Sequence, residues 1–199
     1  MNKKAVFGGI GAVAVLVIGL LVYKAMGLRS EAAKWSGPIK EIVEEDVKHD
    51  GNVTRSHYVS LIDAPVDTVQ KIIWDVQSSP SMVENIKMAK VLEDKGNVKI
   101  VEINLQALTL PLQNFTMEWT LHPEDHRITF KTIKSQAQDI EAEYKLEPSP
   151  DGKRTRLVYT TTSKDKIAVP FPQSVLDSAN RETYVNTVRG IEKTLKQPG

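Results

Sequence analysis

The chain has 199 residues, of which 41% are hydrophobic and 26% are charged, and its net charge at pH 7 is +1. This composition is typical of a globular protein and excludes a collagen-like, mucin-like or wholly disordered chain. A charge so near neutrality excludes nucleic-acid binding through bulk positive charge, so no nucleic-acid partner is expected. The absence of cysteine excludes disulfides, iron–sulfur clusters, thiolate zinc sites and cysteine nucleophiles.

The N-terminal segment differs from the rest of the chain in charge and hydropathy. Residues 1–30 carry basic side chains and no acidic one, whereas the remainder holds more acidic than basic side chains. Residues 5–23 form an uncharged apolar run that, as a helix, spans about 28 Å, close to the hydrocarbon thickness of a bilayer. Two lysines precede this run, and Tyr23 with the following lysine ends it at headgroup level. We therefore predict a single transmembrane anchor over residues 1–24, with the bilayer as partner.

The retention of this anchor and its orientation in the membrane each have an alternative. The alternative to a retained anchor is a cleaved signal peptide, but Ala25–Gly27 is a poor cleavage pattern and the apolar run is long for a signal peptide. Positive charge flanks both ends of the run, so the positive-inside rule does not separate the two orientations. A short N-terminal tail before a single anchor favours a periplasmic or extracytoplasmic domain, and the cytoplasmic side stays open. Gly8 and Ala12 form a small-xxx-small pair that leaves a weak homodimer through the anchor as a further alternative.

Residues 25–52 are predicted to form a juxtamembrane linker. Within it, Ile39, Ile42, Val43 and Val47 recur at helical spacing after a proline. We therefore expect a short spacer helix in this linker.

From Val53 onward the hydropathy alternates with a period of two residues. Runs of this kind cover residues 101–105, 115–121, 128–132 and 140–146. Such alternation indicates strands with one covered face and one wet face. Short connections rich in glycine, proline and aspartate join the runs, so an antiparallel arrangement is expected.

Three helices interrupt or close this predicted sheet. The first begins near Ala64–Asp67, where a proline suits the first turn, and ends near Trp74. A short second helix follows Ser79, and a long last helix runs from about residue 173 to residue 196. The predicted fold class is α+β, with a curved antiparallel sheet of about six or seven strands wrapped around the long C-terminal helix. A single helix need not fill a strongly curved sheet, so the layout leaves room for a cavity between them.

Residues 53–199 are predicted to form one ligand-binding domain. Residues 53–196 of it resemble the START-like, or SRPBCC, superfamily with the helix-grip fold, and within it the polyketide cyclase/dehydrase and coenzyme Q-binding branch. The resemblance rests on the order of the elements and on the opening HYVSLI strand, followed by Asp63–Val69 and by Trp74 before a Ser-Pro turn. It also rests on Val169–Pro172, which leads into the last helix. The resemblance implies a hydrophobic ligand such as a lipid, sterol, quinone or polyketide under the long helix, and in some branches cyclisation or dehydration of that ligand.

The inward-facing strand positions and one stripe of the last helix supply the candidate pocket lining. Met117 and Trp119 are favoured because they are large or adaptable and lie near mid-sheet. A filled hydrophobic core is the alternative for many of these side chains. The predicted lining residues are Val101, Ile103, Leu105, Phe115, Met117, Trp119, Phe130, Tyr144, Tyr159, Arg181, Tyr184 and Val188.

Polar side chains near this lining have two interpretations each. The hydroxyls of Tyr58 and of the predicted lining tyrosines can meet a ligand head group or reach solvent. Asp177 and Arg181 lie four residues apart, so they either pair on the helix surface or stand at the pocket mouth. Residues 106–112 are apolar and broken by a proline, which is compatible with a membrane-touching loop at the entrance or with a plain strand end.

These observations favour a membrane-anchored binding protein or carrier for a hydrophobic small molecule. The alternatives are a cyclase/dehydrase-type enzyme, which would need a carboxylate or histidine converging inside the pocket, and a non-catalytic interaction domain at the membrane. No pair of the four histidines has zinc-ligand spacing with a third ligand, so no metal and no cofactor are expected. No catalytic residue is assigned.

Overall fold

The computed structural model describes residues 33–35, 41–108, 110–167 and 170–197. The chain divides into two units, Met1–Pro38 and Ile39–Gly199. Within the first unit, residues 33–35 are helical. No helix in the described part of the chain is long and apolar enough to cross a bilayer. The predicted anchor, residues 5–23, lies outside the described residues, so it remains a prediction.

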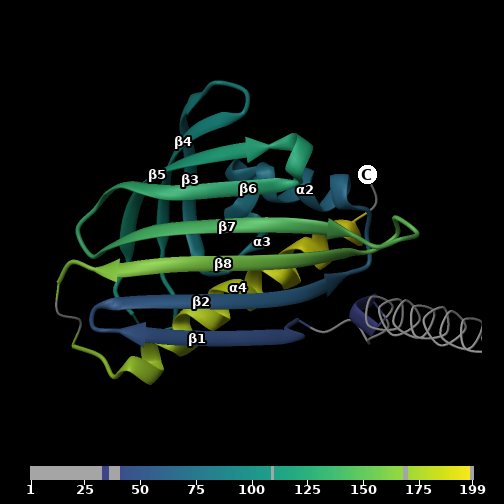
Figure 1. Cartoon of the computed structure of the whole chain (residues 1–199). Helices are drawn as coiled ribbons and strands as arrows, with labels where there is room; N and C mark the ends of the chain where they lie inside the picture. The colour runs from purple at the N-terminus through teal and green to yellow at the C-terminus, as the bar shows by residue number, and fades with distance from the viewer. Residues whose placement is uncertain (1–32, 36–40, 109, 168–169, 198–199) are drawn as a thin grey trace, which may run out of the picture. The chain divides into compact units, whose positions relative to one another are not determined.

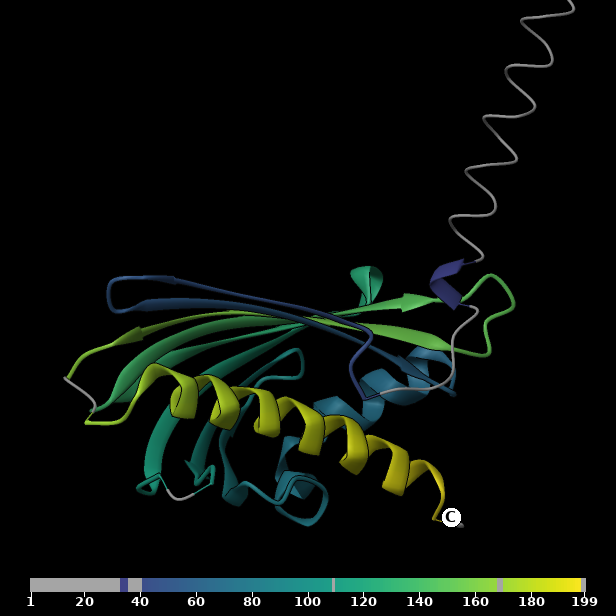
Figure 2. The same cartoon turned by 90° about the horizontal axis from the view of Figure 1, so that it is seen from below.

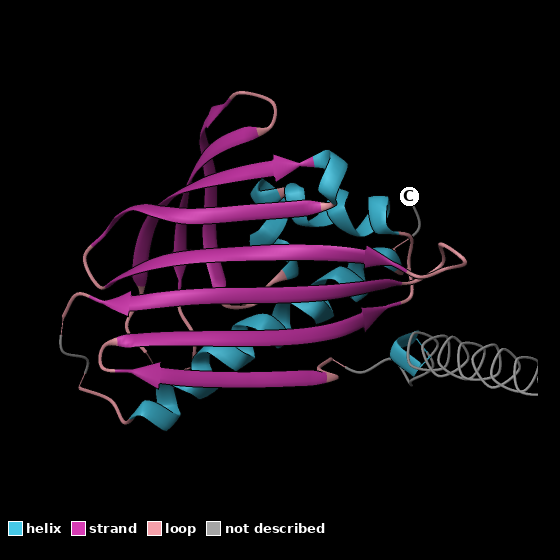
Figure 3. Ribbon diagram, in the orientation of Figure 1, coloured by secondary structure: helices cyan, strands magenta, loops and turns pink. Residues whose placement is uncertain are grey.

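The second unit is an α+β domain built on one eight-stranded antiparallel sheet (Figures 1 and 3). Its strand order is β1-β2-β8-β7-β6-β5-β4-β3. The strands are β1 (Glu44–Asp50), β2 (Val53–Ile62), β3 (Ile86–Asp94), β4 (Val98–Leu105), β5 (Gln113–His122), β6 (Arg127–Ser135), β7 (Gln138–Pro148) and β8 (Thr155–Asp165). The helices are α2 (Val66–Trp74), the short α3 (Ser79–Met82) and the long α4 (Gln173–Leu195), with 3-10 turns at Val76–Ser78 and Pro123–Asp125.

The sheet curves around α4, which crosses its concave face (Figure 2). The period-two alternation places one face of each central strand against the helix, and on β5 this face carries Phe115, Met117 and Trp119, all buried. On α4 the buried positions are concentrated in the second half, from Tyr184 to Ile191. The main core therefore lies between the centre of the sheet and the C-terminal half of α4.

The sequence prediction differed from the structure at the N-terminal edge of the sheet. The sheet has eight strands rather than six or seven, and the expected spacer helix is wrong because residues 44–50 form β1. β1 pairs along its whole length with β2, from Glu44 opposite Val59 to Asp50 opposite Val53. This pairing satisfies a row of β2 backbone groups that would otherwise lie at an open edge. The helical spacing of a few apolar residues stabilises a helix in this segment less than the pairing with β2 stabilises a strand.

One end of the sheet collects several connections and is called the mouth end here. Strand pairing places Val53 opposite Lys164, Gln138 opposite Asp165 and Leu105 opposite Gln113, so the β1–β2, β4–β5, β6–β7 and β8–α4 connections lie together. The α4 helix begins at this end, directly after Pro172. The opposite end carries the β2–α2 connection and the β7–β8 turn.

Candidate ligand-binding site

A cavity of about 130 Å³, called the aromatic cavity, lies between the concave face of the sheet and α4. Strands β2 to β8 and one face of α4 contribute its walls, and the side chains are mostly aromatic or aliphatic with a few amides and hydroxyls. Its lining residues are Tyr58, Ile86, Ile103, Leu105, Phe115, Met117, Trp119, Phe130, Gln138, Ile140, Tyr144, Tyr159, Thr161, Ser163, Asn180, Thr183, Tyr184 and Thr187.

Six rings form a continuous stacked wall along this cavity. The Tyr58 and Tyr184 centroids are 5.1 Å apart, and those of Tyr144 and Tyr159 are 4.7 Å apart. Trp119 stacks on Phe130 at 4.5 Å at the other side of the wall. Offset or tilted aromatic pairs at these distances add packing energy beyond their buried area. The wall therefore offers a ligand flat, polarisable surfaces held in fixed positions.

The tyrosine hydroxyls of this wall are kept in their neutral form. Burial raises the pKa of Tyr159 to about 12. Burial likewise raises the pKa of Tyr144 well above its ordinary value, and it raises the pKa of Tyr58 and of Tyr184. At neutral pH these groups are hydrogen-bond donors and acceptors, and they do not act as bases.

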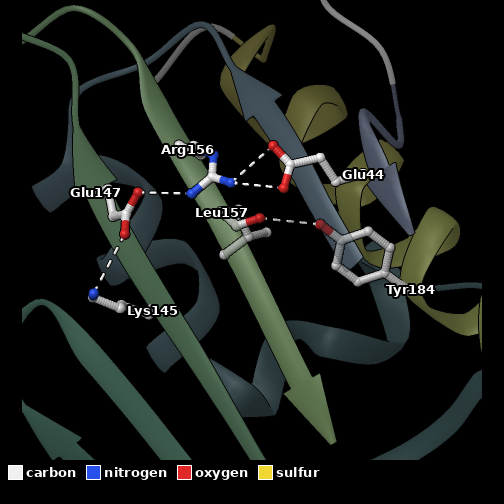
Figure 4. Close-up of polar contacts among 6 residues, drawn as sticks. All are labelled: Glu44, Lys145, Glu147, Arg156, Leu157 and Tyr184. Carbon is white, nitrogen blue, oxygen red and sulfur yellow. Dashed lines mark hydrogen bonds and ion pairs between the residues drawn. The ribbon is translucent and has the colours of Figure 1, made fainter. Parts of the chain in front are cut away.

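The Tyr184 hydroxyl ties α4 to the sheet. It donates a hydrogen bond to Ser60 Oγ at 2.7 Å, and it lies 3.3 Å from the carbonyl oxygen of Leu157 (Figure 4). Both partners are buried strand residues, so the bond forms in a region from which water is excluded. Tyr184 is thereby a structural residue as well as a wall of the cavity.

An ion-pair bridge on the other face of β8 holds the added strand β1. Arg156 donates to both carboxylate oxygens of Glu44 at 3.0 Å and to Glu147 at 2.9 Å (Figure 4). Burial alone would raise the pKa of Glu147, but hydrogen bonds from Arg156 and Lys145 lower it below its ordinary value. Arg156 therefore links β8 to its neighbour β7 and, across the intervening strand β2, to β1, with a bidentate contact to Glu44.

Three further hollows adjoin the aromatic cavity and share residues with it or with one another. The polar cavity, about 60 Å³, meets it at Leu105, Gln138, Ser163, Asn180 and Thr183 and reaches toward the mouth end. The end cavity, about 40 Å³, meets it beyond Trp119, between α2, α3 and α4. The outer hollow, about 390 Å³, is open to solvent at the mouth end and shares Asp165, Gln173 and Leu176 with the polar cavity. The outer hollow and the polar cavity therefore lie in succession between the mouth end and the aromatic cavity.

A larger open groove of about 750 Å³ lies on the opposite face of the sheet. Its lining is dominated by polar and charged side chains, and some of these charges pair with each other, as Lys131 does with Glu118 at 2.9 Å. A ligand pocket is usually enclosed and mostly apolar. The inner cavities fit that description better, so we take them as the candidate site.

The structure brings nine of the predicted lining residues to the aromatic cavity. They are Ile103, Leu105, Phe115, Met117, Trp119, Phe130, Tyr144, Tyr159 and Tyr184. Their contact with a ligand remains a prediction.

Three predicted lining residues lie elsewhere. Val101 and Val188 have no exposed surface and are packed into the core, where neighbouring side chains fill the space in front of them. Arg181 is exposed and forms an ion pair with Glu45 of β1 at 3.0 Å. Asp177 likewise contacts β1, through His49 at 3.2 Å. Asp177 and Arg181 therefore both face β1, the strand that the sequence did not predict.

Sequence reasoning missed the polar part of the lining. Asn180, Thr183 and Thr187 follow one another at helical spacing on α4, a pattern that marks one polar face of the helix. That spacing was the available signal, but its direction toward the sheet is a tertiary property. In the described residues, no group of histidine, aspartate or glutamate side chains is arranged to hold a metal ion.

Comparisons with known proteins agree with this architecture. A curved antiparallel sheet gripping a C-terminal helix over an aromatic cavity defines a START-like α+β protein. The chain belongs to the family described as polyketide cyclase/dehydrase and lipid transport, whose model matches residues 62–183. No curated protein sequence matches this chain significantly.

Several solved structures share the fold at low sequence identity. The Zhui aromatase/cyclase from a Streptomyces species has a TM-score of 0.63 and 15% identity, over 72% of this chain and 94% of that chain. A START superfamily protein from Mycobacterium smegmatis has a TM-score of 0.57 and 13% identity, over 72% and 97%. A STAR-related lipid transfer protein from Xanthomonas axonopodis has a TM-score of 0.54 and 12% identity, over 77% and 99%.

Proposed function

We propose that this chain binds or carries a small hydrophobic molecule in the aromatic cavity, and that residues 5–23 anchor it in a membrane. The observation that carries the first part is the stacked aromatic wall around a partly enclosed, largely apolar space of about 130 Å³. The family and the lipid-transfer protein among its structural neighbours support the same class of ligand. The apolar N-terminal run supports the anchor, which would hold the pocket near a membrane source of ligand.

The size of the cavity sets the scale of the ligand. An apolar cavity of roughly 150 Å³ accommodates benzene, whereas pockets for drug-sized ligands are roughly 300–1,000 Å³. In the described conformation the aromatic cavity therefore fits a single ring or a short branched chain. A larger ligand requires α4 or the β4–β5 connection to move outward.

A cyclase/dehydrase activity has less support from the cavity itself. Its described lining contains no carboxylate, imidazole, lysine or arginine. General acid–base catalysis usually needs such a group within hydrogen-bond reach of the substrate. The tyrosines there have raised pKa values, which disfavours them as bases.

The binding proposal can be tested with fluorine NMR. Of the three tryptophans, Trp119 lies in the cavity wall, so 5-fluorotryptophan gives a local reporter there. The full-length chain would be reconstituted in nanodiscs and titrated with toluene, with empty nanodiscs as reference. We expect a saturable shift of the Trp119 resonance; the absence of any saturable shift would refute binding in this cavity.

Two matched substitutions locate the bound molecule. Ile140→Phe adds bulk inside the aromatic cavity, whereas Ile133→Phe makes the same change at an exposed position of β6. Ile140→Phe should weaken toluene binding, and Ile133→Phe should leave it unchanged. Equal affinities in the two variants would mean that the probe binds elsewhere.

The anchor has its own test, separate from ligand binding. Membranes from cells expressing the full chain would be washed with high salt and alkaline carbonate, beside a chain that starts at residue 30. We expect the full chain to stay in the membrane fraction and the shortened chain to leave it. Release of the full chain would contradict the anchor.

A further inference from the structure

The route from the mouth end to the aromatic cavity changes from polar to aromatic along its length. Amides, hydroxyls and one carboxylate make up about half of the lining of the polar cavity, and apolar side chains make up the rest. Gln113 and Gln138 bond to each other at 3.1 Å, whereas Ser163 and Asn180 make no side-chain hydrogen bond to a described residue. A ligand whose ring occupies the aromatic cavity would place a polar end among these groups.

Asp165 is the only charged residue in the described linings of the polar and aromatic cavities. Asp165 lines both the polar cavity and the outer hollow, and is half-buried at the junction of the two. The described linings of the polar and aromatic cavities contain no lysine, arginine or histidine. Lys166 in the outer hollow is engaged elsewhere, by Asp139 at 2.6 Å and the Ser135 carbonyl at 3.1 Å. An anionic head group would therefore meet a carboxylate with no compensating cation.

Two buried polar atoms in the cavity wall lack partners. Trp119 Nε1 and the Tyr58 hydroxyl each have almost no exposed surface and no hydrogen-bond partner among the described residues. Ser56 lies near enough to the Tyr58 hydroxyl to oppose the rise of its pKa, but their geometry is not that of a hydrogen bond. A buried donor without a partner costs stability. An acceptor atom carried on the ring body of a ligand can satisfy them, since Trp119 and Tyr58 do not line the polar cavity.

We propose, on the basis of the binding function above, that the ligand combines a ring-sized apolar body with a neutral or cationic polar end. The body lies against the aromatic wall, and the polar end lies among Gln138, Ser163 and Asn180 with Asp165 at the portal. Carboxylates and phosphates are excluded as head groups. This places fatty acids and anionic phospholipids outside the ligand class.

Three probes with the same ring and a different end group test the proposal. They are 2-phenylethanol, 2-phenylethylamine and phenylacetate, titrated into the full-length fluorotryptophan-labelled chain in nanodiscs with empty nanodiscs as reference. Because the reporter is Trp119, partition of a probe into the lipid does not mimic binding. We expect the alcohol and the amine to bind and phenylacetate to bind at least about tenfold more weakly, since like charges at short range in a protein repel strongly.

Two carboxylate substitutions separate a local effect from net charge. Asp165→Asn removes the charge at the portal, and we expect it to raise phenylacetate affinity and lower that of the amine while leaving 2-phenylethanol binding unchanged. Asp50→Asn makes the same charge change at an exposed residue of the mouth end that lines none of these cavities. It should change none of the three affinities.

The outcomes distinguish this inference from the proposed function. If toluene binds but phenylacetate binds as tightly as the alcohol, the head-group inference is overturned and hydrophobic binding stands. If Asp50→Asn shifts the affinities as much as Asp165→Asn does, the selectivity comes from overall charge and the portal role is overturned. If neither toluene nor any of the three probes shifts the Trp119 resonance, the binding function itself fails.

Discussion

Replacing Gly190 by alanine tests how α4 is seated over the cavity. Gly190 is buried where α4 packs on the end of α3. A Cβ at this position would lie 2.8 Å from the Met82 carbonyl carbon and 3.0 Å from Met82 Cβ, and would come closest to the Met82 carbonyl oxygen. Because the obstacle includes backbone, a rotamer change cannot relieve it. The close approach of α3 and α4 therefore depends on the missing side chain.

The expected cost follows from two opposing terms. In an unhindered helix, glycine to alanine stabilises by about 1 kcal/mol, whereas inserting atoms into a tightly packed site typically costs roughly 1–3 kcal/mol and occasionally more when nothing can give. The clash with backbone places this site at the upper end, so we expect a net loss of about 2 kcal/mol. For a domain of this size that corresponds to a melting temperature lower by roughly 4–8 °C.

Thermal unfolding of the full-length chain by circular dichroism measures this loss. Lys193→Ala, an exposed change one turn further along α4, is the matched control and should move the melting temperature little. Met82→Ala combined with Gly190→Ala should not restore stability, since the Met82 carbonyl remains. A Gly190→Ala chain as stable as the wild type would refute the tight α3–α4 contact.

Three further predictions concern the tyrosine wall and the two halves of α4. The buried tyrosines have raised pKa values, about 12 for Tyr159, so the folded state holds their protons more tightly than the unfolded chain does. The free energy of unfolding is therefore unaffected by their ionisation below their ordinary pKa of about 10. It falls as the pH rises from there through the folded pKa values. In a Tyr23→Phe chain, which keeps only the four wall tyrosines, near-ultraviolet tyrosinate absorbance should therefore rise together with loss of near-ultraviolet circular dichroism, and early ionisation without unfolding would contradict this. Tyr184→Phe removes the hydroxyl bonded to Ser60 and should cost about 1–2 kcal/mol in denaturant unfolding; an unchanged midpoint would show that the bond contributes nothing. Hydrogen exchange by mass spectrometry should be faster in residues 173–182 than in residues 184–195, and equal protection would argue against local opening at the mouth end.

Much of the sheet could be predicted from the chain because side-chain alternation is a local property. The run from Phe115 to Leu121 carries its inward and outward faces in the sequence itself, and β5 follows it. β1 could not be found in this way. Its sequence, EEDVKHD, has a single apolar residue, and its stability comes from pairing with β2 and from Arg156 and Arg181, which are distant in sequence.

The candidate site was only partly predictable for a related reason. Alternation identifies which residues face inward, but whether an inward residue meets a neighbour or empty space depends on how α4 crosses the sheet. Val101 and Ile103 lie on the same face of β4, yet Val101 is packed and Ile103 borders the cavity. The polar side chains Ser163 and Asn180 are equally inconspicuous in the sequence, since a single serine or asparagine usually lies at the surface.

The distribution of buried residues along α4 ties the small cavity to a route of entry. The second half of the helix contributes Tyr184, Val188 and Ile191 to the main core, whereas the first half is held by a small separate cluster in which Ala179 contacts the β4–β5 connection. Opening costs least where the fewest apolar contacts are broken. The N-terminal half of α4 and the β4–β5 connection should therefore separate before the tyrosine wall is disturbed. Such a separation would enlarge the polar cavity first, next to Asp165, so a ligand would enter body first past the carboxylate and keep its polar end at the mouth.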